Sequence, residues 1–198
     1  MVLTPYDQRR EQLLQIAASV FAAKGYHCTT MRELARTAGM SLAGMYHYVE
    51  GKDELLYLIQ QRSFSRVIAG AERAIASGTY SAERIERFIF HHVTFFARHM
   101  NEMKVLSHEA GSLSEERIEG INALKRRYVD MLVGLLRQLD PPIEDIDPRV
   151  AAYALFGMMN WIYTWYDPSG EVSPESLATQ YTQLFLNGIK SQVPHGGL

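Results

Sequence analysis

The side chains with the most distinctive chemistry lie between positions 29 and 52, where small and hydroxyl-bearing residues stand beside aromatic and basic ones. Ser41, Ala43 and Gly44 fall together at the start of a short helical pattern. A backbone without bulky side chains can approach base edges closely, and hydroxyl, imidazole and ammonium groups can bond to bases or phosphates. Gly44 costs about 1 kcal/mol of helix propensity relative to Ala, so its presence needs such a reason. The alternative is that Ala43 and Gly44 relieve crowding against a neighbouring helix.

Two short helices must position these residues, one on either side of Ala38-Gly39-Met40. Thr30 is predicted to N-cap the first, with Glu33 as its capping-box partner. Gly39 can take the left-handed conformation that commonly ends a helix. The first helix is therefore expected to stop just before the second begins.

The second helix is predicted over residues 42–49, with Ser41 as its N-cap. Met45 and Val49 would face inward on one side of this helix. Neither short helix can bury a core alone, and their separation is typical of a helix-turn-helix, whose second helix enters the major groove. The side chains expected to face outward are Ser41, Leu42, Ala43, Gly44, Tyr46 and His47.

The same stretch resembles the DNA-binding domain of the TetR family of transcriptional regulators. The matching residues are Thr30, Leu34-Ala35, Ala38-Gly39, Met45-Tyr46-His47-Tyr48-Val49, Lys52 and Leu55-Leu56. This resemblance implies a repressor that binds double-stranded operator DNA as a homodimer and responds to a small effector. It also implies a protein that is not an enzyme and carries no cofactor.

By that resemblance, Thr30, Tyr46 and Lys52 would contact phosphates, and Arg32 would lie near the DNA backbone or the groove edge. The bases would be faced by Ser41, Leu42, Ala43, Gly44 and His47. Leu42 stands where a polar residue is frequent in the family, and it can touch a thymine methyl group but cannot read a donor or acceptor.

Composition and patterning favour an all-α protein. The chain has 198 residues, 47% of them hydrophobic, and no convincing alternation of period two. Its net charge is only −2, but bases outnumber acids over residues 9–52, which suits specific DNA binding rather than a nonspecific coat. Cys28 is the single cysteine, which excludes an internal disulfide and a cysteine-cluster metal site. It is expected to be a small packed residue.

Neither a targeting signal nor a long apolar run is evident, so we expect a soluble, cytoplasmic protein that contacts no membrane. We also expect the chain to form two domains. Residues 1–52 would form a three-helix DNA-binding domain, whose amphipathic first helix spans residues 7–24. Residues 53–198 would form a larger domain for effector binding and dimerisation. Arg9 and Arg10 could either meet phosphate or be solvated.

A helix predicted over residues 81–100 places His92 and His99 within an aromatic stripe. These histidines could be core residues, polar anchors of a ligand cavity or metal ligands. Their separation of about 10 Å along the helix makes a shared metal ion the least supported choice, and no metal is predicted. The expected ligand-binding residues are Phe88, His92, Phe95, Phe96, His99, Tyr128, Met158, Trp161 and Trp165.

Two apolar helices are expected near the C-terminus, one over residues 150–165 and one that starts at Ser173-Pro174-Glu175. A helix without a polar face needs cover on both sides, so they are predicted to form a dimer interface, as in the family that the chain resembles. Alternatively, both helices fill a monomer core. The expected interface residues are Phe156, Met159, Tyr163, Tyr181, Leu184, Phe185 and Gly188.

The effector is predicted to be hydrophobic. Residues 160–170 resemble the tail of regulators that respond to acyl-CoA thioesters, so an acyl-CoA or related lipid or aromatic thioester is favoured. Lys125, Arg126 and Arg127 could grip its phosphates or simply form a solvated face. An efflux regulator that binds aromatic drug-like ligands is the alternative. A small helical enzyme that uses His92 or His99 as a base is a remote alternative without a supporting motif.

Overall fold

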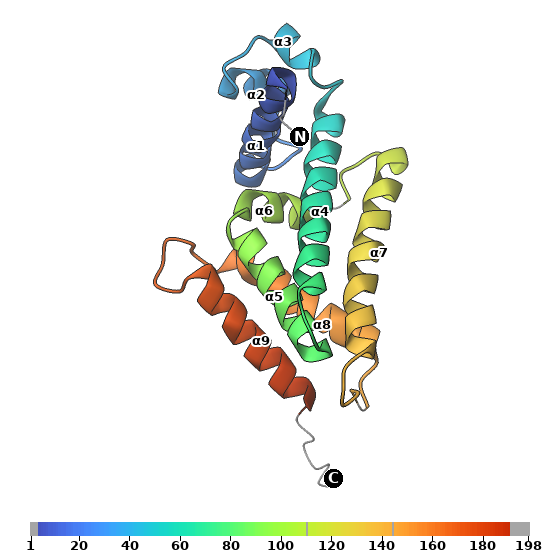
Figure 1. The fold of residues 1–198 in the computed structure, drawn as a ribbon. Helices are drawn as coiled ribbons and strands as arrows, with labels where there is room; N and C mark the ends of the chain where they lie inside the picture. The colour runs from blue at the N-terminus through green and yellow to red at the C-terminus, as the bar shows by residue number, and fades with distance from the viewer. Residues whose placement is uncertain (1–3, 110, 144, 191–198) are drawn as a thin grey trace, which may run out of the picture. The chain divides into compact units, whose positions relative to one another are not determined.

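The computed structural model describes residues 4–109, 111–143 and 145–190, and all regular elements in these ranges are helical (Figure 1). This confirms the predicted all-α class. Residues 191–198, which belong to the predicted second domain, lie outside the described residues. The elements are α1 (Pro5–Lys24), α2 (Met31–Thr37), α3 (Leu42–Tyr46), α4 (Lys52–Ala76), α5 (Ser81–Ala97), α6 (Met100–His108), α7 (Glu115–Arg137), α8 (Pro148–Asn160), the 3-10 helix η1 (Trp161–Thr164) and α9 (Pro174–Lys190).

The chain forms two compact units. The first contains the described residues up to Arg66 together with His99–Leu124, and the second contains Val67–Arg98 with the described residues from Lys125 onward. The chain therefore passes between the units within α4, between α5 and α6, and within α7. These packing units differ from the predicted domains, because the first unit continues beyond residue 52 and includes His99–Leu124. The predicted domains were defined by function, and they stay a prediction.

The first unit is built around α1. Thr4 and Asp7 form a capping box at its start, and Gly25, at φ +84°, ends it. Apolar residues recur along one side of α1, and the core that they form includes α2, α3 and the first turns of α4. The fully or nearly fully buried members include Leu13, Ala17, Phe21, Leu34, Met45, Leu55 and Ile59.

In the second unit, α5 packs along α9 and also contacts α8. Asp147 N-caps α8 by accepting hydrogen bonds from the backbone N–H groups of Arg149 and Val150, and Pro148 occupies the first turn. Within the parts of the chain that the structure describes, every helix is too short or too polar to cross a bilayer.

Three predicted helix boundaries are wrong. The helix expected to reach residue 100 ends at Ala97, because His99 has non-helical dihedrals (φ −129°, ψ 49°) and N-caps α6. His99 therefore does not share a helix face with His92. The helix expected over residues 150–165 becomes a 3-10 helix at Trp161, and α3 ends at Tyr46 rather than at residue 49.

Cys28 also differs from its prediction. It was expected to be packed, but it is exposed in the connection between α1 and α2. The neighbouring Tyr26 and Thr29 fill the buried side of this connection instead.

Candidate DNA interface and effector site

The two short helices of the motif are capped as the sequence predicts. The Thr30 hydroxyl accepts a hydrogen bond from Glu33 N–H at 3.3 Å, and the Ser41 hydroxyl accepts one from Gly44 N–H at 3.0 Å. Gly39 is in the left-handed region at φ +64°. Met45 and Val49 are buried beneath α3. These local interactions fix the turn between the two helices and the start of α3.

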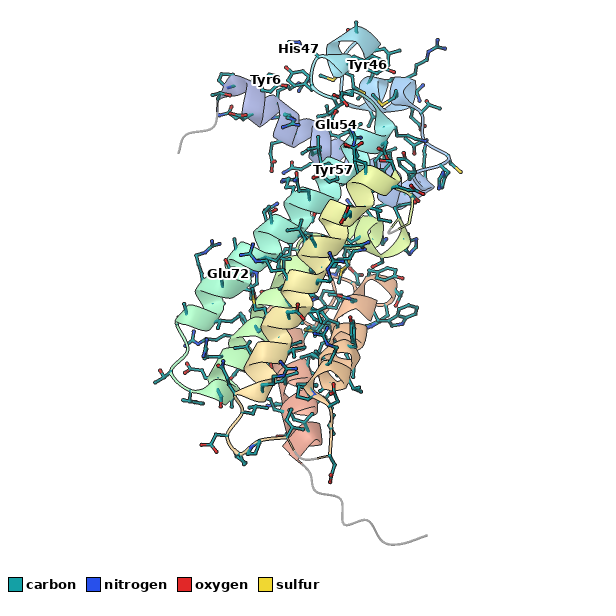
Figure 2. The ribbon with its side chains drawn as sticks, turned by 90° about the vertical axis from the view of Figure 1, so that its right-hand side faces the viewer. Tyr6, Tyr46, His47, Glu54, Tyr57 and Glu72 are labelled. Atoms are coloured by element: carbon teal, nitrogen blue, oxygen red, sulfur yellow. The ribbon has the colours of Figure 1, made fainter. Side chains whose placement is uncertain are left out.

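Tyr46 and His47 are exposed at the end of α3, and Figure 2 shows both at the same end of the first unit. Ser41 and Ala43 are exposed as well. Leu42 departs from the expected pattern, because it is partly buried and packs against the core. Leu42 therefore faces outward only in part.

Gly44 has a local structural role. A Cβ at this position would lie 3.2 Å from the Ser41 Oγ, which is tighter than an ordinary contact. The glycine thus leaves room for the Ser41 hydroxyl that caps α3, and this local packing is one reason for a glycine at position 44. Close approach to DNA is compatible with the same feature, since the backbone stays uncovered at this turn.

Helix α1 holds the motif through two arginines. Arg9 Nη2 donates a hydrogen bond to the Ala38 carbonyl at 3.0 Å, and so supports the C-terminal end of α2. Arg10 lies 3.9 Å from the Glu54 carboxylate. Both side chains were considered for phosphate contact or solvation, and both interact with other parts of the first unit. Arg32, on α2, is exposed.

Lys52 is tied to the connection between α1 and α2. Its Nζ donates hydrogen bonds to the carbonyls of Tyr26 and Thr29, each at 2.9 Å, and lies 4.4 Å from the centre of the Tyr26 ring. An ammonium group has three donors, so two are used in this way. The predicted phosphate contact by Lys52 stays a prediction.

Glu109, which the sequence analysis did not single out, holds the same connection from another element. It is buried just after α6, and its carboxylate accepts hydrogen bonds from Tyr26 N–H at 3.0 Å and Ser112 Oγ at 2.7 Å. Its backbone carbonyl accepts a hydrogen bond from Gln60 of α4 at 3.1 Å. Burial opposes ionisation, but the hydrogen bonds from Tyr26 and Ser112 keep the pKa of Glu109 below its usual value.

Asp53 makes a second link from α4 to the segment His99–Leu124. Its carboxylate accepts hydrogen bonds from Ser114 N–H at 3.2 Å and Arg117 Nη1 at 2.9 Å. Arg117 also bonds to Glu50 at 3.2 Å. The start of α7 is therefore fastened to Glu50 and Asp53, which follow α3.

The second unit contains a buried aromatic cluster around His92, which is 1% exposed. Its Nδ1 lies 3.1 Å from the Tyr128 hydroxyl, and its ring lies 4.9 Å from Phe96 and 5.7 Å from Phe156, centre to centre. The Phe88 ring lies 5.0 Å from that of Tyr128, centre to centre, with the two planes tilted by 34°. Of the predicted ligand-binding residues, Phe88, His92, Phe96 and Tyr128 are thus brought together.

Burial lowers the pKa of His92 to about 3, with the Asn160 side chain opposing this shift. The imidazole is therefore neutral at physiological pH. Its Nε2 is buried, and no hydrogen-bond partner meets it at bonding geometry within the described residues. A neutral imidazole with one unused nitrogen can donate or accept a single hydrogen bond.

The other predicted ligand-binding residues lie in different environments. Phe95 and Met158 are half-buried, whereas Trp161 and Trp165 are largely exposed. His99 belongs to the first unit. A role for these five residues in ligand binding stays a prediction.

The residues predicted for a dimer interface also divide into groups. Phe156, Met159 and Phe185 are buried within the single chain, and Tyr163 and Tyr181 are half-buried. Leu184 and Gly188 are exposed on α9. The inner faces of α8 and α9 therefore fill the core of the single chain, as the alternative prediction has it. Only the outer faces of these helices remain available to a partner.

A capped helix-turn-helix within an all-helical chain defines a DNA-binding regulator. Residues 13–57 match the family model described as bacterial regulatory proteins, tetR family. Residues 78–189 match the model described as tetracyclin repressor-like, C-terminal domain, which spans more than half of the chain. The chain belongs to the TetR family of transcriptional regulators.

Three similar proteins indicate the kind of regulator. The HTH-type transcriptional repressor KstR2 of Rhodococcus jostii is 27% identical over 192 residues, covering 94% of this chain and 93% of the relative. The fatty acid metabolism regulator protein of Bacillus subtilis is 24% identical over 192 residues, covering 93% and 99%. The crystal structure of AibR in complex with isovaleryl coenzyme A and operator DNA has a TM-score of 0.80 and 28% identity, covering 89% of this chain and 97% of that one.

These relationships make the chain a transcriptional regulator of the TetR family. The family consists of DNA-binding regulators without enzymatic activity, which excludes the remote alternative of a small helical enzyme.

The His92 cluster predicts a specific dependence of stability on pH. The folded chain keeps His92 neutral down to about pH 3, whereas the unfolded chain protonates it near 6.5, the ordinary pKa of a histidine in water. The stability due to the neutral form is therefore complete above pH 6.5 and is lost as the pH falls toward 3. Between pH 7 and pH 5 the free energy of unfolding should fall by about 2 kcal/mol more in the native chain than in His92→Gln. Urea unfolding at both pH values measures this difference, and equal losses in the two proteins would contradict the assignment.

Proposed function

We propose that this protein is a ligand-responsive repressor that binds a palindromic operator as a homodimer and is released by a hydrophobic effector. The observation that carries the proposal is α3, a short helix seated on buried Met45 whose outward side chains are small or are able to form hydrogen bonds. Such a helix can enter the major groove closely. The proposal includes a cytoplasmic location, where the operator would be.

In this proposal, Ser41, Ala43, Gly44 and His47 face the bases, and Leu42 can offer only its exposed edge. Thr30, Tyr46 and Lys52 contact phosphates, and Arg32 lies near the groove edge. Tyr46, which is 51% exposed, is supported best among the phosphate contacts because its hydroxyl is available at the surface. Lys52 would contribute its remaining donor while it keeps its bonds to the Tyr26 and Thr29 carbonyls.

The proposed homodimer uses the outer faces of α8 and α9. Tyr153 on α8, Trp161 directly after it on η1 and Leu184 on α9 are large apolar side chains that are 58%, 60% and 63% exposed. Exposed apolar side chains that are grouped in this way favour a protein partner. Gly157 and Gly188 are also exposed and would permit close approach of a second chain. A two-fold dimer would present two α3 helices to a palindromic site.

The proposed effector is an acyl-CoA or a related lipid or aromatic thioester. Two features of the second unit support it. The cluster of Phe88, His92, Phe96 and Tyr128 offers apolar rings and the buried imidazole nitrogen Nε2, which suits an acyl chain that ends in a carbonyl group. The basic run on α7 includes Lys125, which is half-buried, and burial lowers the pKa of its ammonium group.

The basic run itself is only partly available. Arg127 bonds to Glu72 at 2.5 Å, so exposed Arg126 is the better candidate for the phosphates of a CoA group. The structure of AibR with isovaleryl coenzyme A supports this effector class for a protein of the same family. An aromatic drug-like ligand, as in a regulator of efflux, remains the alternative effector.

Release from DNA would use the segment His99–Leu124. This segment belongs to the first unit, where Glu109 and Arg117 fasten it to the residues around the recognition helix. It continues directly into the second unit at both of its ends. A change in α5 or α7 on effector binding would therefore reach the DNA-binding helices along the chain itself.

Selection of bound duplexes from a random pool tests the proposed function. The full-length protein should enrich a palindromic sequence, and adding acyl-CoAs from isovaleryl to long-chain should reduce the bound fraction for at least one of them. Enrichment without an effect of any acyl-CoA would remove that effector class, and aromatic drug-like compounds would then be tested in the same assay. Failure to enrich any sequence would contradict sequence-specific binding by α3.

Substitution on the outer face of α9 tests the homodimer. Leu184→Asp should make the protein monomeric at micromolar concentration, because it places a charge within the proposed apolar interface. Phe90→Asp is the matched control, since Phe90 is an exposed apolar residue of α5 in the same unit. Sedimentation equilibrium should give a dimer for the native chain and the control. The interface is assigned incorrectly if Leu184→Asp sediments as a dimer too.

A further inference from the structure

Tyr6 lies in the first turn of α1, whose backbone is fixed by hydrogen bonds between the residues on either side of it. The Thr4 hydroxyl accepts a hydrogen bond from Asp7 N–H at 3.1 Å, and the Asp7 carboxylate accepts one from Thr4 N–H at 3.1 Å. Pro5 restricts the backbone between them. The first turn of α1 therefore presents the Tyr6 ring in a defined direction, although this turn lies at the surface.

The Tyr6 ring meets two residues that follow α3. It stacks on Tyr48, with ring centres 5.0 Å apart and planes at 24°, and it meets the edge of His47 at 5.9 Å and 87°. His47 and Tyr48 also pack edge to face at 5.4 Å. Figure 2 shows Tyr6 of α1 and His47 at the same end of the first unit. Three rings, one from α1 and two from the residues that follow α3, thus form one group at the surface, which we call the Tyr6 cluster.

His47 needs such support. It is the C-cap residue of α3, so its side chain lies just beyond the helical turns, and it is exposed. A side chain in this position has several accessible rotamers, and ordering it on binding costs free energy. Edge-to-face packing against Tyr6 and Tyr48 restricts the imidazole before DNA is bound. Arg9, one turn further along α1, bonds to the Ala38 carbonyl and holds α1 against the same motif.

We propose that Tyr6 is a positioning residue for DNA recognition, which orients the His47 imidazole toward the base edges and so shapes the operator preference. This inference rests on the proposed function, in which His47 faces the bases. Tyr6 acts through its ring rather than its hydroxyl, because the contacts to His47 and Tyr48 are ring contacts. The expected contribution to operator affinity is about 3- to 10-fold, the usual range for one aromatic pair.

The test compares Tyr6→Phe, Tyr6→Ala, Tyr6→Leu, His47→Ala and the double variant Tyr6→Ala/His47→Ala in the full-length protein. The operator is the sequence that the native chain enriches from random duplexes. Tyr6→Phe should bind like the native chain, whereas Tyr6→Ala and Tyr6→Leu should bind about 3- to 10-fold more weakly. Both should relax the preference at the same base pairs as His47→Ala. The double variant should be no weaker than His47→Ala alone, because one residue acts through the other.

Several results would overturn the inference. Additive losses in the double variant would show that Tyr6 acts independently of His47, and weak binding by Tyr6→Phe would show that the hydroxyl is the contact. Unchanged binding by His47→Ala would remove the base contact that Tyr6 is proposed to orient. Gln15→Ala, an exposed change on α1, is the control, and Tyr6→Leu keeps the apolar bulk if Tyr6→Ala unfolds. In all these cases, enrichment of a palindrome by the native chain would leave the proposed function intact.

Discussion

The first unit depends on the backbone of one buried residue, Tyr26, between α1 and α2. Its N–H donates a hydrogen bond to Glu109, and its carbonyl accepts one from Lys52. Backbone groups that are withdrawn from water need partners, and both partners here are charged, which makes these bonds stronger than neutral ones. Because Lys52 begins α4 and Glu109 follows α6, the placement of the helix-turn-helix depends on elements outside it. In the proposed function, DNA recognition and the response to a ligand would both depend on this support.

The path of the chain explains how the second unit can influence this support. Segment His99–Leu124 packs with the DNA-binding helices, yet it joins α5 and the rest of α7, which belong to the other unit. The His92 cluster lies on those same two helices, through His92 on α5 and Tyr128 on α7. An effector that separates these rings would strain both connections to the segment. A binding event in the second unit therefore has a covalent route to Tyr26.

Local features of the site could be predicted from the sequence, and long-range ones could not. The caps at Thr30 and Ser41 and the turn at Gly39 follow from residue types a few positions apart, and all three predictions are confirmed. The bond between Glu109 and Tyr26 joins residues 83 positions apart and has no local signal. The helix break at His99 also lacks a proline or glycine, so packing rather than propensity ends α5 there.

Operator affinity of a Glu109→Ala protein tests this account most directly. Glu109 is buried and lies outside the helix-turn-helix, and its carboxylate reaches the connection between α1 and α2 through the Tyr26 N–H. Loss of the acceptor leaves the Tyr26 N–H unsatisfied at a cost of about 1–3 kcal/mol, and we expect operator binding to weaken by about 10-fold. Glu119→Ala, an exposed change in the same segment, should bind like the native chain. Native operator affinity in a folded Glu109→Ala protein would contradict the account.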